Sequence, residues 1–154
     1  MSLALQRTLT PAAGRSEWTA TGDAEAKLSI AVVFTTVEST LTALKKAGTL
    51  ANRLGARITL VVPQVVPRPL PLETPPVLLD WSERRFRVIA EQSPVETMVH
   101  IYLCRDRLET LLKAFSPRSV VVIGGRKRWW PTSESRLARK LRNAGHEVIL
   151  AETE

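Results

Sequence analysis

Short apolar runs alternate with segments of helical periodicity along most of the chain, and this alternation constrains the fold more than any other feature. Five runs have the length and composition of strands: residues 28–34, 57–62, 95–104, 119–123 and 147–151. Several are continuously apolar, which is typical of parallel strands buried on both faces. We therefore predict an α/β fold, a Rossmann-like three-layer α/β/α sandwich with a five-stranded parallel sheet and right-handed crossovers.

The segments between these runs carry apolar residues three and four positions apart, as amphipathic helices do. The first helix is predicted from Ser39 to Leu54, with Gly55 as its C-terminal cap. The residues predicted on its apolar face are Leu41, Leu44, Ala47, Leu50, Ala51 and Leu54. Asp106, with Glu109 three residues later, resembles a capping box at the start of the third helix. Further helices are predicted over residues 78–91, 106–115 and 133–143.

Two segments fall outside this alternation. Residues 1–26 show no sustained period, so we interpret them as an N-terminal extension that is not part of the core fold. Residues 27–154 then form one α/β domain. Between Pro63 and Pro76 the chain holds six prolines and no glycine, which predicts a stiff, exposed connection.

Composition excludes several classes of protein. The single cysteine, Cys104, cannot form an internal disulfide, and with two histidines it cannot build a common zinc site. No apolar run approaches the ~18 residues of a membrane span. His100 lies in an apolar strand and has no catalytic grouping around it. We therefore expect a cytoplasmic protein, neither an enzyme nor membrane-bound, without metal.

The strongest candidate site lies where the first and fourth strands end. In open parallel sheets, ligands bind beyond the carboxyl ends of the strands, at the point where the strand order reverses. The glycines there allow close backbone approach, although such a pair often serves only a turn. The last helix offers an N-terminus that suits a phosphate. The candidate nucleotide- or anion-binding residues are Phe34, Thr35, Gly124, Gly125, Arg126, Lys127, Ser133 and Ser135.

Positive charge is concentrated in the same region. The whole chain has a net charge of +7, and seven cations against the single anion Glu134 lie between residues 126 and 142. Such a cluster suits nucleic acid or an acidic partner, with Trp129 and Trp130 available for stacking on bases, or it is a solvated helix face. Beyond Arg126 and Lys127, the basic patch consists of Arg128, Arg136, Arg139, Lys140 and Arg142.

The order of these segments resembles the universal stress protein family. The likeness rests on KLSIAVVF, LANRLGA, ITLVVPQVV, LETLLKAFSPRSVVVIGGR and SRLARKLRNAGHEVILAE, and covers about residues 27–152. It implies a five-stranded parallel sheet and, as in many members, ATP between the ends of the first and fourth strands. It also implies a homodimer along the last strand, through Glu147, Val148, Ile149, Leu150 and Ala151.

The chain departs from the ATP-binding members at two places. Those members carry an aspartate at the end of the first strand, where this chain has Val33 or its neighbour Phe34. They also carry Gly-x2-Gly and a later Gly-Ser/Thr, whereas here Gly124 is followed by Lys127 at the second glycine and the later pair is replaced within residues 132–135. Lys127 would either block the phosphate turn or supply charge to it.

These departures predict a small regulatory or stress-response module that has lost ordinary ATP binding and has no cofactor. Two alternatives stay open. The first is a nucleotide- or other anion-binding member that uses Gly124, Gly125 and the basic residues after them. The second is a binder of nucleic acid or an acidic partner through residues 126–142.

Overall fold

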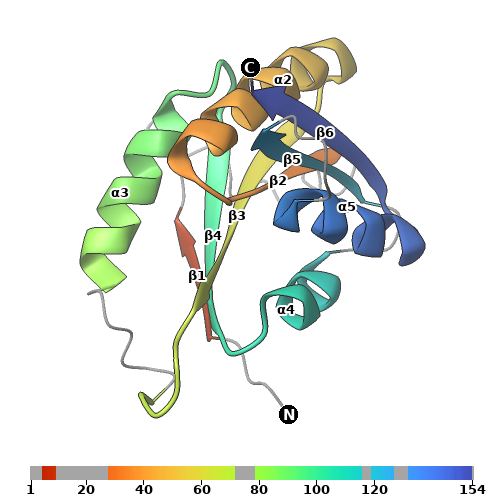
Figure 1. Ribbon diagram of the computed structural model, residues 1–154. Helices are drawn as coiled ribbons and strands as arrows, with labels where there is room; N and C mark the ends of the chain where they lie inside the picture. Colours follow the sequence, from red (N-terminus) through yellow and green to blue (C-terminus); the bar gives the residue numbers. More distant parts are fainter. Residues whose placement is uncertain (1–4, 10–27, 72–78, 116–118, 127–131, 154) are drawn as a thin grey trace.

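A computed structural model (Figure 1) describes residues 5–9, 28–71, 79–115, 119–126 and 132–153 of the chain. Its single sheet has the strand order β1-β4-β3-β2-β5-β6. β2 to β6 pair with one another in parallel, so the predicted five-stranded parallel sheet is confirmed. The strands are β1 Leu5–Leu9, β2 Ser29–Val33, β3 Arg57–Val65, β4 Thr97–Cys104, β5 Val120–Arg126 and β6 Glu147–Thr153.

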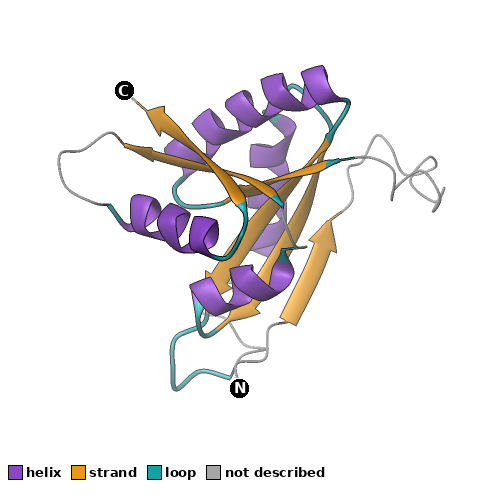
Figure 2. Ribbon diagram, turned by 90° about the vertical axis from the view of Figure 1, so that its right-hand side faces the viewer, coloured by secondary structure: helices purple, strands orange, loops and turns teal. Residues whose placement is uncertain are grey.

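Helices cover both faces of this sheet (Figure 2), which confirms the three-layer sandwich. The helices are α2 Val37–Leu54, α3 Leu79–Glu91, α4 Arg107–Ala114 and α5 Ser133–Asn143. α2 and α3 bury one apolar cluster, which includes Leu44, Phe86 and Ile30 of β2. α4 and α5 bury the other, which includes Leu111 and Leu137. No helix of the described residues is both long enough and apolar enough to span a membrane.

The N-terminal residues contribute a strand that the sequence analysis did not predict. β1 pairs antiparallel with β4, from Leu5 opposite Leu103 to Leu9 opposite Val99. The interpretation of residues 1–26 as lying outside the core fold is therefore wrong for residues 5–9. The physical reason is that β4 would otherwise leave a row of backbone N–H and C=O groups unpaired at the edge of the sheet.

Helix α2 packs on the sheet mainly through small residues, and the predicted apolar face is confirmed for Leu44, Ala47 and Ala51, which are buried. Leu41 and Leu54 are exposed, at 36% and 53%, so their assignment to the apolar face is wrong. The buried side of the helix consists of Ser39, Thr40, Ala43, Leu44, Ala47, Gly48 and Ala51. A Cβ atom on Gly48 would overlap the ring of Pro94, so the helix lies too close to its surroundings for large side chains.

Strand β3 runs further than its neighbour β2 and forms an overhang. β2 pairs with β3 only as far as Val33 opposite Val61, whereas β4 pairs with β3 as far as Val65. Pro63 is therefore part of a strand, and the predicted irregular connection begins later than expected. A proline is tolerated there because one edge of β3 is no longer paired beyond Val61.

Candidate functional site

The structure brings the ends of β2 and β5 together, as the sequence analysis predicted. Val33 of β2 lies opposite Ile123 of β5, and the strand order reverses between these two strands. Just beyond, the hydroxyl of Thr35 donates to the carbonyl oxygen of Gly124 at 3.4 Å. Phe34, Thr35, Gly124 and Gly125 are thus neighbours at the carboxyl end of the sheet.

The two glycines lie within β5 and make room for a helix on each face. A Cβ atom on Gly124 would overlap the backbone carbonyl of Ser39 in α2. A Cβ atom on Gly125 would lie 3.2 Å from Cβ of Glu134 in α5. Successive residues of a strand face opposite sides of the sheet, which is why one glycine meets each helix. The space above both glycines is therefore occupied by protein atoms.

The first cation after the glycines has an internal partner. Arg126 Nη2 donates to Glu38 Oε2 at 3.0 Å, which ties the end of β5 to the first turn of α2. Both side chains are about three-fifths exposed, at 61% and 59%. Lys127, the other basic candidate in this loop, lies outside the described residues, as do Arg128, Trp129 and Trp130.

The hydroxyl of Ser135 is used by a helix cap. Thr132 is the N-cap of α5, and its Oγ1 accepts from the backbone N–H of Ser135 at 3.1 Å. Ser135 Oγ accepts from the backbone N–H of Thr132 at 2.8 Å and donates to its carbonyl at 2.9 Å. Ser133 is the first residue of the helix and is exposed. Of the two serines, Ser135 is therefore committed to local structure.

The described part of the basic patch divides into two groups. Arg136, Arg139 and Lys140 have helical spacing on α5 and are exposed. Arg142 instead donates from Nη2 to the carbonyl of Val148 at 2.9 Å and so fastens the end of α5 to β6. Arg126 lies apart from both groups, beside α2.

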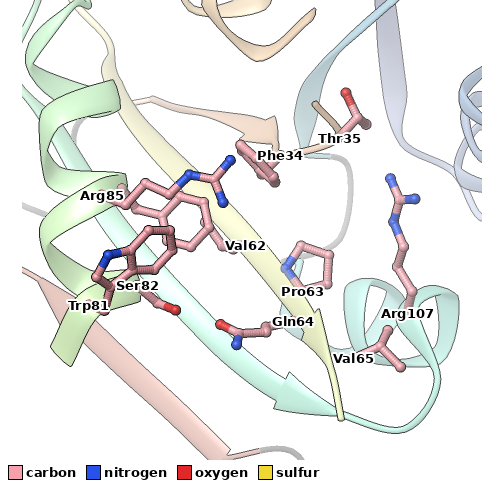
Figure 3. A pocket seen from close by; sticks show the side chains of 11 residues that line it. Phe34, Thr35, Val62, Pro63, Gln64, Val65, Trp81, Ser82, Arg85 and Arg107 are labelled. Carbon is pink, nitrogen blue, oxygen red and sulfur yellow. The ribbon is translucent and has the colours of Figure 1, made fainter. Parts of the chain in front are cut away.

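A cavity of about 370 Å³ opens beside the overhang of β3 (Figure 3). Its floor is the overhang itself, residues 62–65, and its walls come from the end of β2 and from α3 and α4. Phe34 and Thr35 line it, so two of the predicted site residues belong to this cavity. Its volume lies in the range of small-molecule sites, roughly 300 to 1,000 Å³.

One end of the cavity is aromatic. The guanidinium carbon of Arg85 lies 5.6 Å from the ring centroid of Trp81, and 5.8 and 5.7 Å from those of Phe34 and Phe86. Phe34 and Phe86 contact each other edge to face at 4.8 Å. Trp81 is 49% exposed, although it is a large apolar side chain. This end therefore presents aromatic surface beside a delocalised cation.

The other end carries a cation whose hydrogen bonding is incomplete. Arg107 begins α4, and its Nε and Nη2 atoms are buried without a hydrogen-bond partner. Burial lowers the pKa of Arg107, whereas the charge of Glu134 raises it. Between the two ends lies Gln64, whose Oε1 is also buried and unpartnered. Buried donors and acceptors without partners cost free energy, and a polar ligand would recover that cost.

Sequence reasoning missed Arg107, Gln64, Trp81 and Arg85. The switch-point rule led to the ends of β2 and β5, whereas the cavity lies over the end of β3, one strand further along. A usable signal was present in α3, where Trp81 and Arg85 are four residues apart and are therefore neighbours on one helix face. The sequence carried no such indication for Arg107, because its position beside the cavity depends on how α4 follows β4 in the fold.

The described residues that line the cavity include no carboxylate, histidine or cysteine. Across the described ranges, no three potential ligands among His, Cys, Asp and Glu come together as a metal site would require. No model of a known protein family matches the chain, and no curated protein matches it.

Proposed function

We propose that this chain is a non-catalytic, universal-stress-protein-like regulatory module that binds a small organic anion in the cavity over β3. One observation carries the proposal: Arg107 lines a cavity of about 370 Å³, and two of its guanidinium nitrogens are buried without a hydrogen-bond partner. Buried guanidinium nitrogens without hydrogen-bond partners are costly, and an anionic ligand would offset that cost. The cavity also lies where α/β sheets bind their ligands, at the carboxyl ends of the strands.

Three observations support the loss of ordinary ATP binding. The space over Gly124 is taken by the Ser39 carbonyl, and a side-chain atom of Glu134 lies close over Gly125, so neither glycine leaves an open cradle for phosphate. Arg126 is paired with Glu38. At the end of β2, where ATP-binding members are expected to carry an aspartate, Val33 is buried in the core and Phe34 packs on Phe86.

Thermal unfolding of the full chain tests this function. A ligand that binds only the folded state stabilises it by RT ln(1 + [L]/Kd), about 2.7 kcal/mol at a hundredfold excess over Kd. Among benzoate, phosphate and ATP with magnesium, we expect benzoate to raise the melting temperature and ATP to leave it unchanged. Arg107→Gln should abolish the rise. Arg136→Gln removes the same charge from an exposed site and should keep it.

Two results would overturn the proposal. The first is a rise in melting temperature with ATP that persists in Arg107→Gln, because ATP would then bind at the switch point between β2 and β5. The second is the absence of a shift with every anion tested, from acetate to aromatic carboxylates, at millimolar concentration.

Homodimerisation through β6 belongs to the same proposal. β6 pairs with β5 on one side and is the last strand of the described sheet, so its outer edge is open to a second copy. The segment that would pair is Glu147–Thr153. Sedimentation equilibrium should give a dimer at micromolar concentration. A monomer at a hundred micromolar would contradict this expectation.

A second candidate function is nucleic-acid binding, which the shared exposure of Arg136, Arg139 and Lys140 on α5 favours. Neutralising phosphates makes the logarithm of affinity fall with the logarithm of salt concentration, with a slope of about −0.9 per phosphate on duplex DNA. Replacing the three cations by glutamine should then reduce that slope. Absence of binding at low salt would remove this candidate.

A further inference from the structure

The two ends of the cavity differ in chemistry, and together they indicate the chemical class of the ligand and not only its negative charge. Figure 3 shows Trp81 and Arg85 of α3 on one side, Arg107 of α4 on the other, and Pro63 and Gln64 of β3 between them. A ligand that spans the cavity would therefore meet aromatic surface at one end and a guanidinium at the other. This arrangement points to a ligand with a flat apolar part and an acidic group.

The unpartnered atoms of Arg107 indicate the kind of acidic group. Nε and Nη2 form one edge of the guanidinium plane, and their two parallel N–H bonds match the two oxygens of a carboxylate. Glu134 is a charged neighbour of Arg107, and its negative charge disfavours a multiply charged anion there.

The aromatic end indicates the flat part of the ligand. Trp81 is a large aromatic residue left half exposed at a cavity wall, and Arg85 lies against its ring at 5.6 Å. Planar rings stack on indole and guanidinium surfaces, and this geometry favours them over saturated rings of equal size. Phe34, Val62 and Phe86 add apolar surface to a wall that also contains Thr35 and Ser82.

We infer that the cavity binds an aromatic carboxylate, whose carboxyl group pairs with Arg107 and whose ring lies against Trp81 and Arg85. This inference rests on the proposed function, and it adds the chemical class of the ligand. A nucleoside polyphosphate fits less well, because the described cavity wall offers only two cations, one of them next to Glu134.

Calorimetric titration of the full chain with three matched probes tests the class of ligand. The probes are 2-naphthoate, its saturated counterpart decahydro-2-naphthoate, and the neutral 2-naphthalenemethanol. We expect 2-naphthoate to bind about threefold to tenfold more tightly than the saturated acid, since aromatic contacts contribute that much beyond burial. The neutral alcohol should bind at least tenfold more weakly than 2-naphthoate.

Variants test which residues contact the carboxyl group and which contact the ring of the ligand. Arg107→Gln should weaken 2-naphthoate at least tenfold and leave the weak binding of the alcohol unchanged. Trp81→Ala should weaken 2-naphthoate and erase its advantage over the saturated acid. Arg84→Gln and Val88→Ala alter exposed residues of α3 that do not line the cavity, so both should bind as the wild type does.

The outcomes separate this inference from the proposed function. Equal affinity for the aromatic and saturated acids, both lost in Arg107→Gln, would overturn the aromatic class and leave the anion site standing. Tighter binding of adenosine monophosphate than of 2-naphthoate would also overturn the carboxylate class. Failure of every acid to bind would overturn both.

Discussion

Gly124 of β5 lies directly beneath the backbone carbonyl of Ser39 in α2, so close that a Cβ atom could not fit between them. This contact fixes how near the N-terminal end of α2 comes to the sheet. It also explains the position of Thr35, which follows β2 and donates its hydroxyl to the Gly124 carbonyl at 3.4 Å. A residue that resembled part of a phosphate loop in the sequence is thus a packing residue in the fold.

Gly124→Ala should therefore destabilise the protein by about 2 kcal/mol or more, because the added methyl group meets backbone that cannot move away cheaply. Gly125→Ala is the matched control. Its added Cβ lies 3.2 Å from a side-chain atom of Glu134, which can shift, so the loss should be smaller. Urea unfolding of both variants measures the difference. Equal free energies of unfolding would contradict the assigned role of Gly124.

The helices and strands that could be predicted from the sequence are those with a clear local pattern of apolar residues. Helix α5 spans Ser133–Asn143 as predicted, because Leu137 and Leu141 are four residues apart among charged residues and so define one apolar face without help from the rest of the chain. The apolar run at residues 119–123 marks β5 for the same reason. The cap at Gly55, with φ +63°, was readable because only glycine adopts that conformation at little cost.

What the sequence did not reveal depends on segments that meet only after folding. β1 forms because β4 has an open edge with which it can pair. The sequence of residues 5–9 does not show that β4 would be its pairing partner. The buried side of α2 was predicted only in part: Leu44, Ala47 and Ala51 are buried as expected, whereas Leu41 and Leu54 are exposed. The sequence did not show that the closeness of Ser39 to Gly124 and of Gly48 to Pro94 requires small residues at those contacts. The cavity was missed because its lining comes from four elements that are separate in the sequence.

Asp106 caps the helix that carries Arg107, so its removal should affect both stability and the site. Asp106 Oδ1 accepts from the backbone N–H of Glu109 at 2.9 Å, which confirms the N-cap half of the predicted capping box. Asp106→Ala should lower the free energy of unfolding by about 1 kcal/mol. Glu109→Ala is the control, because its side chain only forms an exposed ion pair with Lys113 at 2.9 Å. That variant should lose no more than about 0.5 kcal/mol. A greater loss in the control would contradict the assignment of the cap.

Cys104 should react slowly with thiol reagents while the protein is folded. Burial is the largest effect and raises the pKa of its thiol above the ordinary value. A hydrogen bond with Thr110 opposes this, and the charges of Asp106 and Arg107 have smaller effects that raise and lower the pKa respectively. Fewer thiolates are then present at pH 8 than in the unfolded chain, and the side chain is also shielded from reagent. Alkylation by iodoacetamide should be at least tenfold faster in urea than in buffer. Equal rates would show that the thiol is accessible in the folded state.

His100 makes the stability of the protein depend on pH in a predictable direction. Burial lowers its pKa below the ordinary value of 6.5, so the folded state binds this proton less readily than the unfolded chain does. The neutral form is compatible with folding, and its contribution is fully present above pH 6.5. As the pH falls below that value, the unfolded chain takes up the proton first and the free energy of unfolding decreases. The decrease ends once the pH is below the pKa of the folded state.

The difference between wild type and His100→Gln isolates this contribution from that of the other titrating groups. Gln keeps a polar side chain at the position but does not titrate. Urea unfolding between pH 7.5 and 5.0 should therefore show a steeper loss of stability in the wild type than in the variant, with the two curves parallel above pH 7. Parallel curves over the whole range would mean that His100 titrates alike in the folded and unfolded chains, and burial would then not govern its charge.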